Sequence, residues 1–213
     1  MSPYLRPRQK NWPSHYHLTG FWFASEHADI NPELEKFIEA GQPPVVVTFG
    51  SMISPVNSRI KELLSDVCHR SGIRAVMQGA GPFGRTNDCI FSTGYIPHGW
   101  LFPRAACVVL HGGAGTAAAV FRAGVPGVFI PHGRIYDQTY WAQIAWEMGC
   151  AVEPISFSDL SVDRLETAIR RTIESKSIRL RTAELGRKIR GGNGVYQAWK
   201  MVDDLVDRIG LCD

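Results

Sequence analysis

The sequence of 213 residues lacks paired cysteines and long apolar runs. Its five cysteines lie far apart and form no Cys-x-x-Cys pair, which argues against a disulfide framework and favours reduced thiols. No apolar run approaches the roughly 18 residues that a membrane-spanning helix needs, and residues 1–14 contain no apolar segment typical of a signal peptide. We therefore expect a cytoplasmic protein.

The chain also has little charge of one sign and no acidic metal-binding triplet. Its 23 basic and 20 acidic residues are spread along the sequence, without the block of like charge that binds nucleic acid or lipid. We therefore expect no nucleic-acid partner. There is no Asp-x-Asp triplet, and the pair His15 and His17 has no further ligand at metal-site spacing. No metal site is expected.

What is present is the composition of an ordinary globular domain, with 45% hydrophobic and 20% charged residues. Residues 1–30 are rich in proline, aromatic residues and histidine, and show no sustained period before Leu18. We interpret them as an interdomain linker-like segment whose aromatic side chains pack on this domain or on another one. Residues 31–213 are expected to form one domain.

Beyond residue 30, the hydrophobic pattern alternates between buried strands and amphipathic helices. Strands are predicted at residues 45–49, 73–77, 89–91, 106–110 and 127–130. Helices are predicted at residues 32–40, 58–71, 116–123, 138–148, 162–174, 178–189 and 195–209, with a short helix or turn at 97–102. This alternation predicts an α/β fold with a single Rossmann-like, doubly wound parallel sheet.

The last predicted helix carries an apolar stripe in 4-3-4-3 spacing. The stripe consists of Val195, Trp199, Val202, Val206 and Ile209. A stripe of this width buries itself against another surface in a folded protein. We therefore expect it to pack on something.

A glycine-rich turn follows one of the predicted strands. Residues 111–116, His-Gly-Gly-Ala-Gly-Thr, join the strand at 106–110 to an alanine-rich helix. Glycines let a backbone approach a phosphate closely, and a helix N-terminus carries about half a positive charge. The His111 imidazole and the Thr116 hydroxyl add two donors. A phosphate site is therefore predicted, and a plain structural turn is the alternative reading of these residues alone.

A second glycine motif competes with this one. Gly79, Gly81 and Gly84 match the Gly-x-Gly-x-x-Gly pattern of dinucleotide-binding folds. However, Pro82 and the polar residues 85–88 are not typical of a helix start, and no acidic residue that could bind a ribose occurs between residues 89 and 110. We interpret this motif as a loop.

Several motifs, taken in order, resemble the donor-binding half of UDP-sugar-dependent glycosyltransferases. They lie at residues 12–13, 19–22, 94–103, 111–116, 122–126, 137–138 and 141. Within these enzymes, the chain resembles the sterol glucosyltransferases and their bacterial relatives, from about residue 10 to about residue 205. The resemblance implies that the chain is the C-terminal domain of a GT-B fold, in which two Rossmann-like domains face each other.

The resemblance also implies a role for each matching residue. Gly50 and Ser51 would border the phosphates, and the backbone of Ile96 would pair with the uracil edge. His98 stands where plant relatives have a glutamine, and it would also face the donor. Tyr95 replaces a tryptophan that stacks on the base in those relatives.

The phosphates and the sugar would lie at the glycine-rich turn and at the residues that follow the next strand. The pyrophosphate would lie against His111, Gly113, Ala114, Gly115 and Thr116. Asp137 and Gln138 match a pair that binds the sugar hydroxyls. Residues 132–136 form a longer connection than the family usually has, and Ala119 replaces a glutamate that binds ribose, so the pocket is expected to differ in shape.

The implied activity is an inverting, metal-independent transfer of a hexose from a UDP-sugar, expected to be UDP-glucose, to a lipid, sterol or other small hydroxyl acceptor. The donor is a substrate, and no cofactor is expected. In the family the catalytic base is a histidine of the N-terminal domain, so no catalytic residue is assigned here. Alone, the chain is expected to be inactive.

The expected partners are the nucleotide-sugar donor and an N-terminal acceptor-binding domain or a separate partner chain, through which peripheral contact with a membrane could occur. Two alternatives stay open. One is a nucleotide-sugar-binding module without catalysis, and the other is an enzyme similar to a sugar-nucleotide epimerase. Asp137 and Gln138 with Trp141 favour the transferase over the epimerase.

Overall fold

A six-stranded sheet in the order β3-β4-β2-β1-β5-β6 forms the centre of the molecule. The computed structural model describes residues 1–25, 29–49, 55–79, 83–132 and 136–209, without the side chains of residues 55–58 and 136. The strands are β1 (Val45–Thr48), β2 (Ala75–Gln78), β3 (Gly84–Arg85), β4 (Ile90–Thr93), β5 (Cys107–Leu110) and β6 (Gly127–Phe129). All neighbouring pairs are parallel except β3 with β4.

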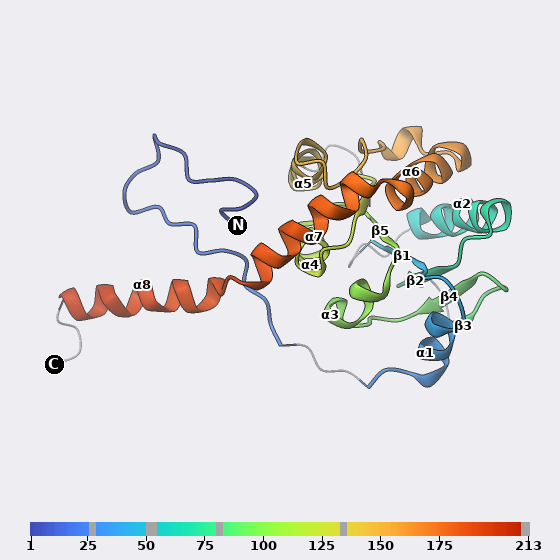
Figure 1. Cartoon of the computed structure of the whole chain (residues 1–213), viewed down its shortest axis with the longest axis horizontal. Coiled ribbons are helices and arrows are strands. Elements are labelled where there is room, and N and C mark those ends of the chain that lie inside the picture. The colour runs from blue at the N-terminus through green and yellow to red at the C-terminus, as the bar shows by residue number, and fades with distance from the viewer. Residues whose placement is uncertain (26–28, 50–54, 80–82, 133–135, 210–213) are drawn as a thin grey trace.

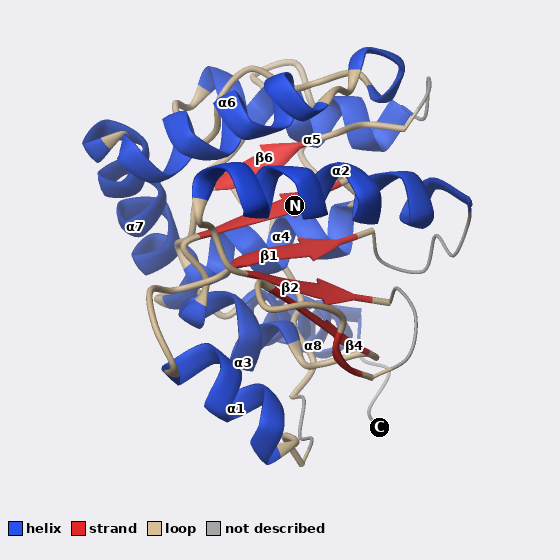
Figure 2. Cartoon of the chain, turned by 90° about the vertical axis from the view of Figure 1, so that its right-hand side faces the viewer, coloured by secondary structure: helices blue, strands red, loops and turns tan. Residues whose placement is uncertain are grey.

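Helices cover both faces of this sheet (Figure 2). One face packs against α2 (Pro55–Ser71) and α6 (Val162–Glu174), next to the short 3-10 helix η2 (Phe157–Asp159). The other face packs against α1 (Pro32–Glu39), α3 (His98–Leu101), the 3-10 helix η1 (Phe102–Arg104), α4 (Ala114–Ala123), α5 (Tyr136–Glu147) and α7 (Lys176–Arg190). The predicted α/β, Rossmann-like, doubly wound fold is confirmed.

The two faces follow from the alternation of side chains along each strand. On β1, Val46 lies in the core beneath α1, α4 and α5, whereas Val45 and Val47 lie in the core beneath α2 and α6. Because both faces are covered, every residue of β1 is buried. The continuous β-branched run in the sequence reflects this burial.

Capping residues fix where several helices begin. Asn31 Oδ1 accepts a hydrogen bond from the Glu33 backbone N–H at 2.8 Å at the start of α1. Ser161 Oγ accepts one from Arg164 N–H at 3.3 Å at the start of α6. Each side chain satisfies a donor that the first helical turn leaves without a partner, which explains why the sequence located both helix starts.

The structure differs from the sequence prediction at the second glycine motif. Gly84 begins β3, which pairs antiparallel with β4, so the sheet is not purely parallel. Residues 80–82 lie outside the described residues. A dinucleotide-binding motif would lead into a helix at this point, whereas Gly84 here begins a short strand at the sheet edge.

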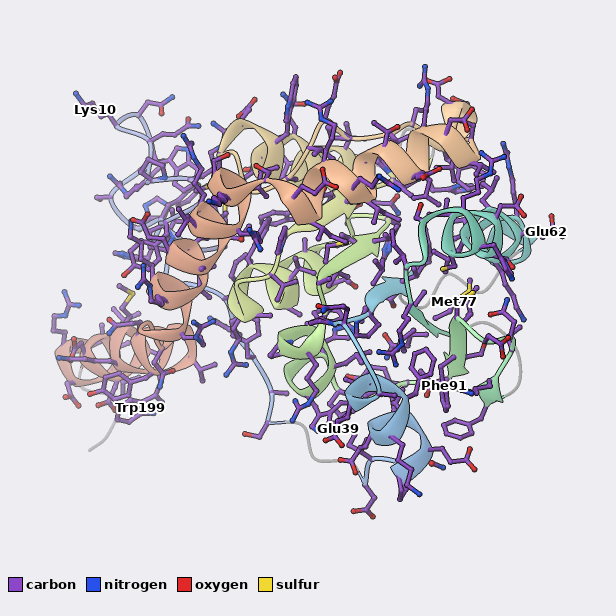
Figure 3. All side chains as sticks on the ribbon, turned by 45° about the vertical axis from the view of Figure 1, so that its right-hand side comes forward. Lys10, Glu39, Glu62, Met77, Phe91 and Trp199 are labelled. Carbon is purple, nitrogen blue, oxygen red and sulfur yellow. The ribbon has the colours of Figure 1, made fainter. Side chains whose placement is uncertain are left out.

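The last helix, α8 (Gly194–Ile209), extends away from the helices that cover the sheet (Figure 1). Its apolar stripe is exposed except at the half-buried Val206, with Trp199 at 57% and Val202 at 60% of full exposure. Figure 3 shows Trp199 on this outlying helix, whereas Met77 and Phe91 lie within the body of the domain. The expected packing of the stripe is therefore not met within the described part of this chain.

The linker-like segment lies partly on the domain. Phe21 and Phe23 are half-buried against the core, whereas Tyr16 and Trp22 are exposed. The proposed boundary at residue 30 stays a prediction. No helix in the described ranges is long and apolar enough to span a bilayer. Cys68, Cys89, Cys107 and Cys150 are free thiols, and Cys212 lies outside the described residues.

Candidate functional site

The candidate site lies at the carboxyl ends of β1 and β5. These two strands are neighbours, but the chain continues from β1 to β2 on one side and from β5 to β6 on the other. Ligands of open α/β sheets bind in the crevice at such a switch point. Phe49 and His111 leave the two strands there, and their ring centroids are 6.1 Å apart.

The imidazole of His111 lies over the N-terminus of α4. A Cβ added to Gly113, the N-cap residue, would overlap His111 Nε2 and lie 3.1 Å from its Cε1. A side chain at position 113 would therefore displace the ring. His111 is only 7% exposed, and its buried Nδ1 has no hydrogen-bond partner among the described residues. A ligand that hydrogen-bonds this ring would satisfy a polar group that otherwise costs about 1–3 kcal/mol.

The environment of His111 sets its charge. Burial lowers the pKa of His111 below its usual value of 6.5, and the nearby Asp137 carboxylate opposes this with a smaller effect. The imidazole is therefore neutral at pH 7. A neutral ring offers one donor and one acceptor nitrogen.

The first turn of α4 presents backbone donors next to this ring. Gly113 gives no side-chain cap, and the first helical hydrogen bond runs from Ala117 N–H to Gly113 O at 2.9 Å. The N–H groups of residues 114–116 therefore have no acceptor within the helix. Ala114 and Gly115 are exposed, so these donors and the positive end of the helix dipole face a space open to a ligand.

Residues of α5 complete this end of the site. Gly112 adopts φ +95°, and a Cβ there would lie 2.7 Å from the backbone oxygen of Gln138. Gln138 is buried, and its Oε1 accepts a hydrogen bond from the His132 backbone N–H at 2.8 Å. Asp137 is exposed. The structure thus brings the predicted sugar-binding pair next to the glycine-rich turn, with Gln138 also holding the connection that follows β6.

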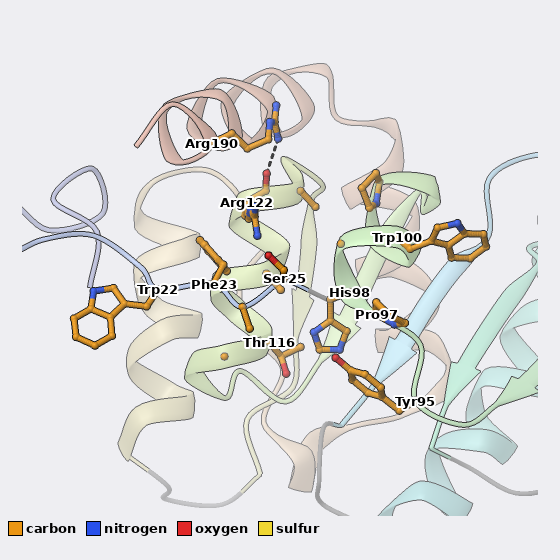
Figure 4. Close-up of a pocket in the computed structure, with 16 residues that line it drawn as sticks. Trp22, Phe23, Ser25, Tyr95, Pro97, His98, Trp100, Thr116, Arg122 and Arg190 are labelled. Carbon is orange, nitrogen blue, oxygen red and sulfur yellow. Dashed lines mark hydrogen bonds between the residues drawn. The ribbon is translucent and has the colours of Figure 1, made fainter. Parts of the chain in front are cut away.

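A groove of about 1000 Å³ extends from this turn between α3 and α4 (Figure 4). Thr116 and Ala119 line it from α4, and Tyr95 and His98 line it from the opposite side. The His98 ring stacks on Phe102 with 4.3 Å between centroids, which fixes its plane. The lining in the described part of the chain contains no carboxylate, consistent with alanine at position 119.

Ile96 lies between Tyr95 and Pro97, which both line the groove. It is buried, and its carbonyl accepts a hydrogen bond from Gln78 Nε2 at 2.8 Å. A carbonyl oxygen has a second lone pair, so a base could still bind there. Gly50 and Ser51 lie outside the described residues. The roles assigned to all of these residues stay predictions.

Sequence reasoning missed part of the groove. Residues 23–25 and Arg190 also line it, although no local motif marks them, and Trp22 and Arg122 lie in motifs to which no role in the site was assigned. Tertiary packing brings residues 23–25 and Arg190 to the groove from the segment before α1 and from α7. Over the described ranges, no three His, Cys, Asp or Glu side chains are grouped as a metal site.

Comparisons with known proteins find related sequences and structures. Residues 56–190 match the model of the erythromycin biosynthesis protein CIII-like C-terminal domain. The O-mycaminosyltylonolide 6-deoxyallosyltransferase of Streptomyces fradiae is 32% identical over 206 residues, which are 95% of this chain and 48% of that protein. Sterol 3-beta-glucosyltransferase UGT80A2 of Arabidopsis thaliana is 30% identical over 205 residues, covering 93% of this chain and 32% of the relative.

A solved structure has the same fold. The glycosyltransferase VinC, in complex with dTDP, superposes with a TM-score of 0.63 at 21% identity and covers 83% of this chain and 44% of VinC. The chain thus spans about half or less of the length of these proteins.

Proposed function

The chain belongs to the glycosyltransferases that carry an erythromycin biosynthesis protein CIII-like C-terminal domain, and we infer that it is the donor-binding half of an inverting, metal-independent enzyme. This enzyme transfers a hexose from a UDP-sugar to a lipid, sterol or other small hydroxyl acceptor. The observation that carries the proposal is the buried His111 imidazole over the uncapped N-terminus of α4, at the switch point of the sheet.

Sugar transfer requires stabilisation of the departing nucleoside diphosphate, which gains negative charge as the glycosidic bond breaks. The N–H groups of residues 114–116 and the neutral His111 imidazole are placed to donate to its oxygens. Donors fixed in advance need no reorganisation during the reaction, so they can supply this stabilisation without a divalent cation. Asp137, exposed beside the turn, would orient the sugar hydroxyls.

The acceptor and its base would come from a second half, which is an N-terminal domain or a separate chain. The chain covers 48% of one relative and 32% of another, which leaves a large part of each unmatched. The exposed stripe of α8 offers an apolar surface for such a half. Alone, the chain would bind the donor and transfer nothing, and any peripheral membrane contact would come through the other half. A cytoplasmic location stays a prediction.

The base and sugar of the donor need a direct test. VinC was solved with dTDP, and the groove of this chain presents alanine where plant relatives carry a ribose-binding glutamate. Calorimetric titration with UDP, UDP-glucose, dTDP and GDP measures both choices in one series. We expect UDP and UDP-glucose to bind and GDP not to bind. If dTDP binds more tightly than UDP, the enzyme uses a thymidine-based donor, and if no nucleotide binds, the proposal is wrong.

Activity separates the transferase from its alternatives. The chain is assayed for donor hydrolysis and transfer alone and then joined to, or mixed with, an acceptor-binding half. Restored transfer supports the proposal. Nucleotide binding without restored activity in any combination would indicate a binding module, and conversion of UDP-glucose to an epimer would indicate the epimerase.

A further inference from the structure

The segment that precedes α1 forms part of the groove described above. Phe23, Ala24 and Ser25 lie along the same groove as His98 and Thr116, which are about 75 and about 90 residues away in sequence. Figure 4 shows Ser25 between Arg122 and Thr116 along α4. A ligand that fills the groove would therefore touch both the domain and this segment.

Contacts with the domain hold this segment in place at Phe21 and at Phe23, and Phe23 itself lines the groove. The guanidinium of Arg122 lies 4.4 Å from the centroid of the Phe23 ring, which is within the range of a cation–π interaction. Arg190 Nη1 donates to the Arg122 carbonyl, which ties the end of α7 to the same place. The Phe21 ring lies 5.8 Å from Trp141, so aromatic contacts anchor the segment on α5 as well.

The segment is also fixed where it crosses the start of α8. A Cβ on Gly20 would lie 3.3 Å from Gly194 Cα, and a Cβ on Gly194 would overlap the carbonyl oxygen of Phe21. The two backbones are therefore in close contact. The packing of the domain thus holds residues 20–23 in this conformation.

The length of the groove along α4 leaves room for the nucleoside part of the donor. A helix rises about 1.5 Å per residue, so the stretch of α4 from Thr116 to Ala123 is about 10 Å long. The phosphates are placed at its Thr116 end by the proposed function, on which this inference rests. The remaining length, toward Arg122, is left for the nucleoside.

We propose that residues 23–25, held by Arg122, form the outer wall of the nucleoside part of the donor groove. Nucleotide binding and the packing of this segment on the domain then stabilise each other, because a ligand that touches both the segment and the domain favours contact between them. Phe23 is a positioning residue: it keeps the wall in place through Arg122. A consequence is that any movement of the linker-like segment changes the affinity for the donor.

The first test measures UDP affinity by calorimetry in Phe23→Ala, with Tyr16→Ala as the matched control. Tyr16 is an exposed aromatic residue of the same segment that lies outside the groove. We expect the UDP dissociation constant to rise about 5- to 50-fold in Phe23→Ala, within the usual range of coupling between two sites, and to stay unchanged in Tyr16→Ala. Phe23→Tyr keeps a ring under the guanidinium and should restore wild-type affinity.

The second test measures the reverse coupling in the unaltered protein by amide hydrogen exchange. Saturating UDP should slow exchange at residues 20–25 in the wild type and leave it unchanged in residues 8–16. If Phe23→Ala does not fold, Phe23→Leu carries the same expectation, because it keeps an apolar contact and removes the ring. Unchanged UDP affinity in folded Phe23→Ala or Phe23→Leu protein, or unchanged exchange at residues 20–25, overturns the inference and leaves the proposed function standing. No UDP or dTDP binding by the wild type overturns the proposed function itself.

Discussion

Replacing Gly113 with alanine is expected to displace the His111 imidazole while leaving α4 in place. Gly113 adopts φ −59° and ψ 143°, which alanine tolerates. The added Cβ would overlap His111 Nε2 and lie 3.4 Å from its Cδ2. Since an imidazole can rotate about its side-chain bonds, the ring moves and the backbone stays. Alanine is also a weaker N-cap than glycine, which costs at most about 1 kcal/mol of folding free energy.

The magnitude follows from the hydrogen bond that the displaced ring can no longer make. A hydrogen bond to a charged group contributes about 1–3 kcal/mol. The UDP dissociation constant should therefore rise about 5- to 150-fold. His111→Ala removes the same ring and should weaken UDP binding by a similar factor. In the double variant the two losses should not add, because the second substitution removes nothing that the first has left in place.

Titration calorimetry with UDP at fixed pH and ionic strength measures the four affinities of this double-mutant cycle. Thermal unfolding of each variant is recorded beside it, so that a lost site is distinguished from a lost fold. Unchanged affinity in a folded Gly113→Ala protein would refute the placement of the His111 ring over the helix N-terminus. Full additivity in the double variant would refute the claim that both substitutions act through this ring.

Three further predictions concern stability. Gly112→Ala places a Cβ at φ +95° and 2.7 Å from the Gln138 backbone oxygen, so it should lower the free energy of unfolding in urea by about 2 kcal/mol or more. Ser161→Ala removes the cap that accepts from Arg164 N–H and should cost about 1 kcal/mol without changing UDP affinity. Because burial lowers the pKa of folded His111 below 6.5, the unfolded chain takes up the proton first as pH falls below that value. The wild type should therefore lose more stability than His111→Ala between about pH 7.5 and 5.5, and equal losses would contradict this.

The sequence predicted the parts of the fold that local chemistry determines. The β-branched run in β1 and the caps of α1 and α6 each specify an element through residues next to one another. The glycine-rich turn is likewise a local pattern, and the candidate site that it indicated stays a prediction. The start of α4 was predicted at Thr116 but lies at Ala114, because Gly113 itself is the N-cap residue.

The remaining features depend on contacts between distant residues. Residues 23–25 meet the groove because contacts with distant residues hold the segment, among them the packing of Phe23 under Arg122, about 100 residues away. The two-residue strand β3 is defined by its pairing with β4, and it is too short to show the alternation of apolar and polar residues that marks a strand. Neither feature leaves a local pattern in the sequence from which it could be predicted.

Helix α8 shows which part of the molecule is incomplete without another surface. The helical spacing of its apolar residues was recognised correctly from the sequence. Such spacing identifies an apolar face of a helix, but it does not identify the surface that covers this face. Helices in proteins gain most of their stability from tertiary packing of an apolar face, so a surface that covers the stripe would stabilise α8. The candidate site depends on buried strands and on α4, which the chain packs by itself. Under the proposed function, donor binding and docking to a second half would therefore be separable, and loss of the α8 stripe should leave the UDP affinity measured by calorimetry unchanged.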